Sequence, residues 1–183
     1  MQTLIVTPNE AGQRLDKLLA KYMNQAGKGF LYKMMRKKNI TLNGKKCDGS
    51  EHLGEGDEIR LFLADETIAK FTGGGAAKPI SGYYPKPDII YEDSHILVVN
   101  KPAGLLSQKA REDDTSLNEA ILNYLIDSGR MPVEQLRTFR PSICNRLDRN
   151  TSGLIVAGKS LAGLQQMGEL FKERTLKKYY LCI

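Results

Sequence analysis

The first 65 residues show two stretches in which apolar residues recur at the spacing of a helix. Over residues 13–24 the apolar positions fall three or four apart, and polar residues fill the other faces. A second stretch, residues 30–38, repeats this spacing. The pattern predicts two amphipathic helices, whose buried residues would be Leu15, Leu18, Leu19 and Tyr22 in the first and Phe30, Leu31, Met34 and Met35 in the second.

After the second helical stretch the spacing changes to that of strands. Two short runs, 40–42 and 45–47, flank Asn43-Gly44, the dipeptide best suited to a tight hairpin because both residues tolerate a positive φ. A second turn at residues 54–57 precedes an alternating strand at 58–63. Residues 1–65 are therefore predicted to form a small domain of two helices and a sheet.

Residues 66–87 are rich in glycine and proline. Because glycine loosens a chain and proline removes a hydrogen-bond donor, we predict a flexible linker here. The run Gly73 to Gly75 is no phosphate-binding loop, because no Gly-Lys-Ser/Thr follows it.

The second half of the chain, residues 88–183, resumes the regular patterns. Residues 88–91 and the apolar run 96–99 predict strands, the second buried on both faces. Residues 116–126 predict a helix that begins with a capping box of Ser116 and Glu119.

The pattern of residues 154–183 predicts one more helix between two strands. Residues 154–157 are a strand pattern, and Ser160 can cap a helix that buries Leu161, Leu164, Met167 and Phe171. Residues 177–183 alternate again, with Tyr179 on the apolar face. Taken alone, this tyrosine is expected to be a core or cross-strand residue.

The charge of the chain favours a polyanionic partner. Its net charge is +6 with a pI near 9.2, and Lys28, Lys33, Arg36, Lys37 and Lys38 follow one another with no acidic residue between them. Such a stripe suits RNA phosphates, although a solvated helix face is the usual role of a charge run.

Composition also narrows the classes of protein. The three cysteines, Cys47, Cys144 and Cys182, have no metal-ligand spacing, so we expect neither a disulfide framework nor a metal site. There is no long apolar run, so we expect no membrane span, and the cysteine usage favours a reducing cytoplasm.

The candidate chemistry lies at residues 145–157, where a charge-dense turn leads into an apolar strand. Asp148 stands between Arg146 and Arg149. Since nearby positive charge lowers the pKa of a carboxyl group, we expect Asp148 to be ionised and able to act as a nucleophile or a base. The alternative is that Asp148 caps its own turn at Asn150 and Thr151.

The stretch from Arg146 to Leu154 resembles the active-site signature of the RluA-type pseudouridine synthases, which isomerise uridine in structured RNA. Where that family usually has His before the Arg, this chain has Asn145. The run from Tyr91 to Gly104 resembles the first motif of the family, in which we interpret Lys101 as a structural lysine. Lys177-Lys178-Tyr179 resembles the third.

A second resemblance covers the first domain. Arg14 to Leu19, the basic second helix, Ile40 to Lys45 and Gly56 to Ile59 resemble the RNA-binding module first known from ribosomal small-subunit protein four. The expected fold is therefore α+β, with that module at 1–65, the linker at 66–87, and the N-terminal portion of a mixed, mainly antiparallel synthase domain at 88–183.

These resemblances imply roles for individual residues. Asp148 would be the catalytic carboxylate, Arg146 would fill the space left by a flipped uridine, and Tyr179 would line the base pocket. No cofactor is implied, because the isomerisation involves no net redox change. RNA contacts are expected from a set of basic residues: Arg14, Lys28, Lys33, Arg36, Lys37, Lys38, Lys45 and, as electrostatic support for the reaction, Arg149.

Three functions stay open at this point. The first is an RNA uridine isomerase, acting as a monomer on RNA that is expected to be ribosomal. The second is a non-catalytic RNA-binding protein with an inactive remnant of a synthase domain, and the third is an Asp-dependent hydrolase. Because members of the family continue beyond the equivalent of Ile183 and carry there an arginine that pairs with the catalytic Asp, we expect the chain to be truncated and itself inactive.

Overall fold

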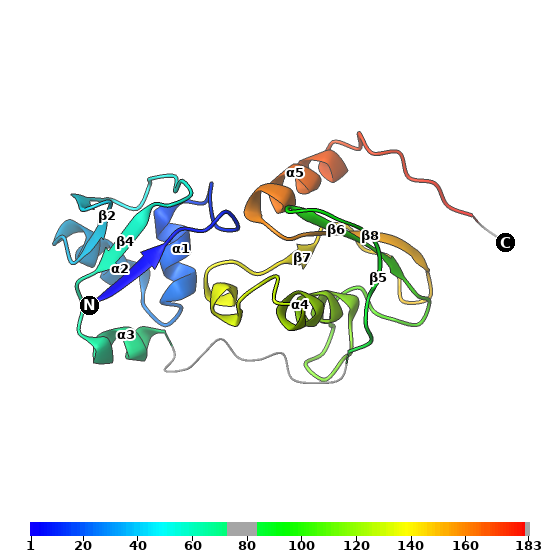
Figure 1. The fold of residues 1–183 in the computed structure, drawn as a ribbon, viewed down its shortest axis with the longest axis horizontal. Coiled ribbons are helices and arrows are strands. Elements are labelled where there is room, and N and C mark those ends of the chain that lie inside the picture. The colour runs from blue at the N-terminus through cyan, green and yellow to red at the C-terminus, as the bar shows by residue number, and fades with distance from the viewer. Residues whose placement is uncertain (73–83, 182–183) are drawn as a thin grey trace. The chain divides into compact units, whose positions relative to one another are not determined.

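The computed structural model describes residues 1–72 and 84–181 (Figure 1). The chain divides into two compact units. The first is Met1–Pro79 with Gly129–Arg140, and the second is Ile80–Ser128 with Pro141–Ile183. Most of the predicted linker, residues 73–83, lies outside the described residues.

Within its described residues, the first unit contains a four-stranded antiparallel sheet and three α-helices. The strands are β1 (Gln2–Ile5), β2 (Ile40–Leu42), β3 (Lys45–Lys46) and β4 (Glu58–Leu61), in the order β1-β4-β2-β3. The predicted helices are α1 (Leu15–Tyr22) and α2 (Lys28–Arg36). Their apolar faces join the sheet in one core, whose fully buried members include Leu15, Leu19, Met35, Ile40, Ile59 and Leu61.

The hairpin between β2 and β3 confirms the turn prediction. Asn43 and Gly44 have φ values of 51° and 72°, both in the left-handed region that this dipeptide tolerates. The Asn43 side chain also donates to Asp57 Oδ1 at 2.9 Å and accepts from the backbone N–H of Glu58 at 2.8 Å. The amide therefore ties the hairpin to the start of β4.

The first part of the predicted linker is helical. Residues 65–71 form α3 (Asp65–Phe71), with Ile68 buried and the Phe71 ring 4.6 Å from that of Phe30. The linker prediction rested on the Gly and Pro content further along the chain. The aromatic and β-branched residues of α3 pack against the first unit, so the regular structure continues to Phe71.

A segment from the second half of the sequence also belongs to the first unit. Residues 129–140 contain the 3-10 helix η1 (Val133–Arg137). Thr138 Oγ1 donates to the carboxylate of Glu10, and Asn9 Nδ2 donates to Gln135 Oε1 at 3.1 Å. The sequence placed these residues within 88–183, because the contacts span more than a hundred positions and leave no local pattern.

The second unit contains another antiparallel sheet, with strands β5 (Asp88–Glu92), β6 (Ile96–Lys101), β7 (Ser142–Ile143) and β8 (Gly153–Gly158). Their order is β5-β6-β8-β7. The prediction that residues 96–99 are buried on both faces is wrong, since Leu97 and Val99 are buried while Ile96 and Val98 are only half-buried. Antiparallel sheets commonly have only one covered face, which explains the alternation.

The described part of the second unit also contains two helices, α4 (Leu117–Asp127) and α5 (Leu161–Lys172). Ser160 caps α5 as predicted, with its Oγ accepting from the N–H of Gly163 at 3.1 Å. The capping box predicted for α4 does not form, because Ser116 Oγ donates to the side chain of Glu119 and accepts no backbone N–H. The apolar residues predicted to be buried in α5 are only half-buried.

The strand predicted at 177–183 is wrong over its described part. Residues 177–181 have no regular structure and are exposed, and 182–183 lie outside the described residues. A strand needs a neighbouring strand for its backbone hydrogen bonds, and none pairs with this segment in the described part of the chain.

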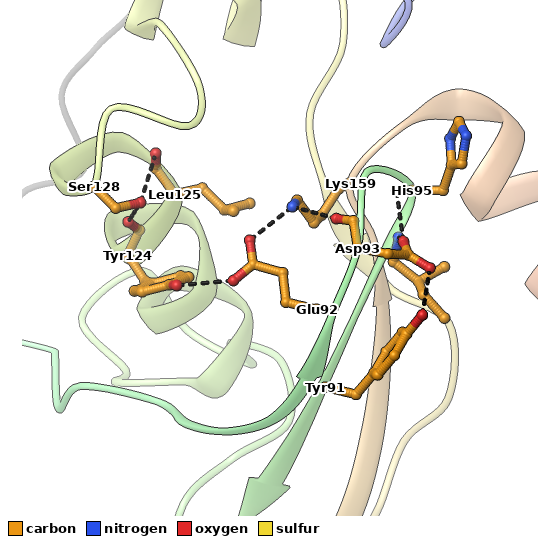
Figure 2. Close-up of polar contacts among 9 residues, drawn as sticks. Tyr91, Glu92, Asp93, His95, Tyr124, Leu125, Ser128 and Lys159 are labelled. Atoms are coloured by element: carbon orange, nitrogen blue, oxygen red, sulfur yellow. Dashed lines mark hydrogen bonds and ion pairs between the residues drawn. The ribbon is translucent and has the colours of Figure 1, made fainter.

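A polar network joins β5, α4 and the end of β8 (Figure 2). Lys159 Nζ lies 2.7 Å from Glu92 Oε1, and Tyr124 donates its hydroxyl to Glu92 Oε2 at 2.8 Å. On the adjoining turn, Asp93 accepts from the N–H groups of His95 and Ile96 at 2.7 Å each. Because both partners of the ion pair are largely buried, removing either would leave an uncompensated charge.

Two glycines of α5 provide a matched test of this unit. A Cβ at Gly163 would collide with the carbonyl oxygen of His95, whereas one at Gly168 would meet nothing. We expect Gly163→Ala to lower the free energy of unfolding by about 1–3 kcal/mol through overpacking. Gly168→Ala should raise it by roughly 0.5–1 kcal/mol through helix propensity. Urea unfolding of the two variants should therefore shift in opposite directions, and a stabilised Gly163→Ala chain would contradict the close approach.

Candidate active site and RNA-binding surface

The candidate site is the loop between β7 and β8. β8 is paired along its whole length with β6, so the loop is attached to a rigid part of the sheet. Arg146, Asp148 and Arg149 are all exposed. The loop ends at Gly153, whose φ of 136° lies in a region where residues with side chains are strained. The three charged groups are therefore presented to solvent from fixed backbone.

A second loop, residues 102–107, holds the candidate loop in place. Ser107 Oγ donates to the carbonyl of Leu147 at 2.6 Å and accepts from the Leu147 N–H at 3.1 Å. Arg149 Nε donates to the Gly104 carbonyl at 3.1 Å, and the Gly104 N–H donates to the Arg149 carbonyl at 2.8 Å. These bonds fix the backbone on both sides of Asp148, and we call them the loop clasp.

The ammonium group of Lys101 is hydrogen-bonded to backbone carbonyls of both loops. Lys101 is fully buried, and its Nζ donates to the carbonyls of Pro102, Leu105 and Arg149 at 3.0, 2.8 and 3.1 Å. Burial lowers the pKa of Lys101, and the negative charge of Asp148 opposes this shift. The structure thus confirms the interpretation of Lys101 as a structural lysine.

Asn145 anchors the start of the loop to β8. Its Nδ2 donates to the Leu154 carbonyl at 3.2 Å, and its Oδ1 accepts from the Val156 N–H at 2.8 Å. The amide therefore pairs with two backbone groups of the strand. A side-chain amide presents a donor NH₂ group and an acceptor oxygen side by side, which suits this double contact.

The carboxylate of Asp148 does not cap its own turn. The Thr151 N–H donates to the Asp148 backbone carbonyl at 3.1 Å. Within residues 1–72 and 84–181, no hydrogen bond or ion pair engages the Asp148 side chain. The alternative based on an Asx turn is therefore not supported, and the carboxylate is free to meet a ligand.

Tyr179 lies at the surface in this structure. Its side chain is 84% exposed, in a segment without regular structure. The alternative place in the core is therefore not observed, and the expected place in a base pocket stays a prediction. A cavity of about 150 Å³ borders the second loop at Pro102 and Leu105, and Tyr179 is not among the residues that line it.

The basic residues predicted to bind RNA divide between the two units. Lys28, Lys33 and Arg36 are exposed on α2, followed by Lys37 and Lys38, and Lys45 is exposed on β3. We call Lys33, Arg36, Lys37 and Lys38 the basic stripe. Arg14 is exposed as well, but its Nε and Nη2 each lie 3.1 Å from an oxygen of Asp16. Arg149 belongs to the second unit and to the loop clasp.

Sequence reasoning missed the positioning roles of Ser107 and Asn145. Ser107 lies 40 residues from its partner Leu147, so no local spacing could have indicated the contact. Asn145 lies directly before the signature, but only the pairing of the loop with β8 shows what its amide binds.

Metal and thiol chemistry find no support in the described part of the chain, where no cluster of His, Cys, Asp and Glu could hold a metal ion. Cys47 and Cys144 are free thiols. Burial raises the pKa of both, that of Cys47 to about 11, which makes it a poor nucleophile. Cys182 lies outside the described residues. No described helix has the length and apolar character needed to cross a membrane.

The loop clasp predicts a measurable change in loop dynamics. Ser107→Ala removes both bonds to Leu147, leaving a partly buried N–H and carbonyl without that partner, at a cost of about 1–3 kcal/mol. We expect amide hydrogen exchange at residues 147–149 to accelerate by about 5- to 100-fold. Ser94→Ala, at an exposed turn, is the control and should leave exchange in the loop unchanged. Equal exchange in both variants would show that Ser107 does not hold the loop.

Comparisons with known proteins find similar chains over this part of the sequence. Residues 95–183 match the family described as RNA pseudouridylate synthase. The ribosomal large subunit pseudouridine synthase C of Rickettsia bellii is 34% identical over 98% of this chain and 58% of its own length. That of Escherichia coli K12 is 29% identical over the whole of this chain and 54% of its own length.

The chain thus spans somewhat more than half the length of these relatives. A solved structure of human RNA pseudouridylate synthase domain containing 4 aligns with 48% of the chain at 25% identity and a TM-score of 0.38. The family match includes the whole candidate loop and β8. Residues 95–183 are thus similar to the RNA pseudouridylate synthase family.

Proposed function

We propose that this protein isomerises uridine to pseudouridine in ribosomal RNA of the large subunit, with Asp148 as the catalytic carboxylate. The observation that carries the proposal is the loop between β7 and β8, which holds an exposed and unengaged carboxylate on backbone fixed by the loop clasp. This loop lies within the family match, and relatives over the same span are named for this activity.

The reaction needs a carboxylate rather than a cofactor. The bond from base to sugar is broken, the uracil turns, and a carbon–carbon bond forms at the same sugar carbon, so the product is an isomer of the substrate. Asp148 would either add to the anomeric carbon or remove the neighbouring sugar proton, and both roles require the ionised form. In each case the proton lost from carbon five of uracil passes to solvent.

The neighbouring residues would position the nucleotide. Arg146 is exposed and two residues from Asp148, which suits a side chain that replaces a uridine flipped out of its stack. Arg149 is tied through Nε to Gly104 and would supply positive potential near the phosphates. Tyr179 would line the uracil pocket once residues 177–181 pack against the domain.

The first unit is proposed to bind the RNA backbone. Its basic residues on α2 and β3 are exposed, and α2 contains no acidic residue. We assign residues 1–65 to a module like that of ribosomal small-subunit protein four and residues 88–183, apart from the segment 129–140 that belongs to the first unit, to the synthase portion. A monomer acting on ribosomal RNA in the cytoplasm is the simplest setting for this function.

A second candidate function is RNA binding without catalysis. The exposure of Tyr179 favours it, because the structure then lacks one wall of a base pocket. Binding and turnover assays separate the two functions, since only the first proposal requires Asp148.

The basic stripe should carry much of the affinity for RNA. Changing Lys33, Arg36, Lys37 and Lys38 together to Ala removes four candidate phosphate-binding groups. We expect the slope of log K against log salt to fall in magnitude by about 0.7–0.9 for each phosphate that is no longer neutralised. The control removes the same charge elsewhere, at Lys70, Lys86, Lys172 and Arg174. An unchanged slope in the stripe variant would exclude this surface as the RNA platform.

Asp148 should be indispensable for turnover. Asp148→Asn keeps the size of the side chain but removes the charge, so we expect tritium release from RNA labelled at carbon five of uracil to fall by at least about 10³-fold. The assay uses the 183-residue chain and the same chain joined to the C-terminal part of the Escherichia coli relative. Asp127→Asn, at an exposed helix end, is the control. Near-normal release by a folded Asp148→Asn protein would refute the assignment.

A further inference from the structure

One aromatic ring lies within the basic face of α2. Tyr32 is four residues after Lys28 and four before Arg36, so the three side chains share one face of the helix. Tyr32 is 37% exposed, and the two flanking cations are exposed as well. The order along this face is therefore cation, aromatic ring, cation.

The ring of Tyr32 is held in a fixed position. Its hydroxyl donates to Asp16 Oδ2 at 2.9 Å, and the guanidinium of Arg14 binds both oxygens of the same carboxylate. The ring also packs against Gly49, where an added Cβ would lie 3.3 Å from Tyr32 Cε1. Gly49 has a φ of 96°, so the backbone passes close to the ring at a position that favours glycine.

This arrangement differs from that of an ordinary exposed tyrosine. A ring that is already fixed loses little conformational entropy when a planar ligand stacks on it. Tyr91 offers a comparison, since it is 51% exposed and its hydroxyl donates to Asp93 at 3.0 Å, but its neighbours along the chain include Glu92 and Asp93. Cations flank Tyr32 on its own helix face, whereas the residues that follow Tyr91 in the chain are acidic.

Fixed aromatic rings between cations suit single-stranded nucleic acid, because every base has a face that stacks and every nucleotide carries a phosphate. Lys28 and Arg36 are about 12 Å apart along the helix axis, so their long side chains can reach phosphates on either side of one stacked nucleotide. We infer that Tyr32, with Lys28 and Arg36, forms a stacking site for an unpaired nucleotide of the RNA. This inference deepens the proposed RNA-binding role of the first unit and rests on it.

The test compares two RNAs of equal length, one without internal pairing and one closed into a hairpin stem. Tyr32→Ala in the 183-residue chain should weaken binding of the unpaired RNA by about 5- to 100-fold and that of the hairpin by less than about 2-fold. The salt slope should not change, because no phosphate-binding group is removed. Tyr32→Phe keeps the ring and should stay within about 3-fold of the unmodified chain.

Two further variants control for fold and for general loss of an aromatic residue. Tyr32→Leu keeps apolar volume over Gly49 without a ring for stacking, so it should lose selectivity for the unpaired RNA even if Tyr32→Ala unfolds. Tyr91→Ala makes the same truncation away from the basic face and should change neither affinity.

The other possible results of these measurements would overturn the stacking site. Equal weakening for both RNAs, or an equal effect of Tyr91→Ala, would overturn the stacking site. The same holds if a poly-glutamate peptide binds as tightly as the RNA and depends equally on Tyr32, since the partner would then be an acidic peptide. If Tyr32→Ala has no effect while the basic-stripe variant still lowers the salt slope, the stacking site fails and the proposed RNA binding stands. If the unmodified chain binds neither RNA, both fail.

Discussion

The buried ammonium group of Lys101 is the interaction on which the candidate site depends. A charge without water needs several strong partners, and here three backbone carbonyls from two loops supply them. Because β6 carries Lys101 and the Arg149 carbonyl lies next to Asp148 in the chain, the position of the carboxylate is linked directly to the central strand pair. Displacing any of these carbonyls would leave the ammonium under-bonded, so the two loops are held together.

The remainder of the second unit supports this linkage. The pairing of β6 with β8 fixes the two ends of the candidate loop, and Asn145 adds two hydrogen bonds between the loop and β8. At the opposite end of the same strands, Lys159, Glu92 and Tyr124 join β8 to β5 and α4 (Figure 2). The exposed charged groups of the candidate loop are therefore carried by strands and loops whose own polar groups are largely hydrogen-bonded.

In the first unit, by contrast with Lys101, the basic residues of interest are exposed rather than buried. The lysines and arginine of the basic stripe are exposed and lie outside its core, so they can bind a ligand without any change in packing. Tyr32 lies between these two situations. Its hydroxyl is hydrogen-bonded within the protein, while its ring remains partly exposed to solvent. Electrostatic attraction and stacking would therefore act from α2 and the two lysines that follow it.

The sequence alone determined the local elements and the location of the candidate site. Helical spacing predicted α1 and α2, Asn43-Gly44 predicted the hairpin, Ser160 predicted the cap of α5, and the signature around Asp148 predicted the family. These features depend on neighbours within a few residues, where backbone sterics and periodicity are decisive. Resemblance supplied the roles that periodicity could not.

Only the tertiary structure decided which distant groups meet. The contacts of Ser107 with Leu147, of Lys101 with Arg149 and of residues 129–140 with the first unit join positions far apart in sequence, which no local pattern records. The same limit explains the failures at β6 and at 177–181. A run of apolar residues shows that a segment can be buried or paired, but whether a partner covers it is set by the rest of the fold.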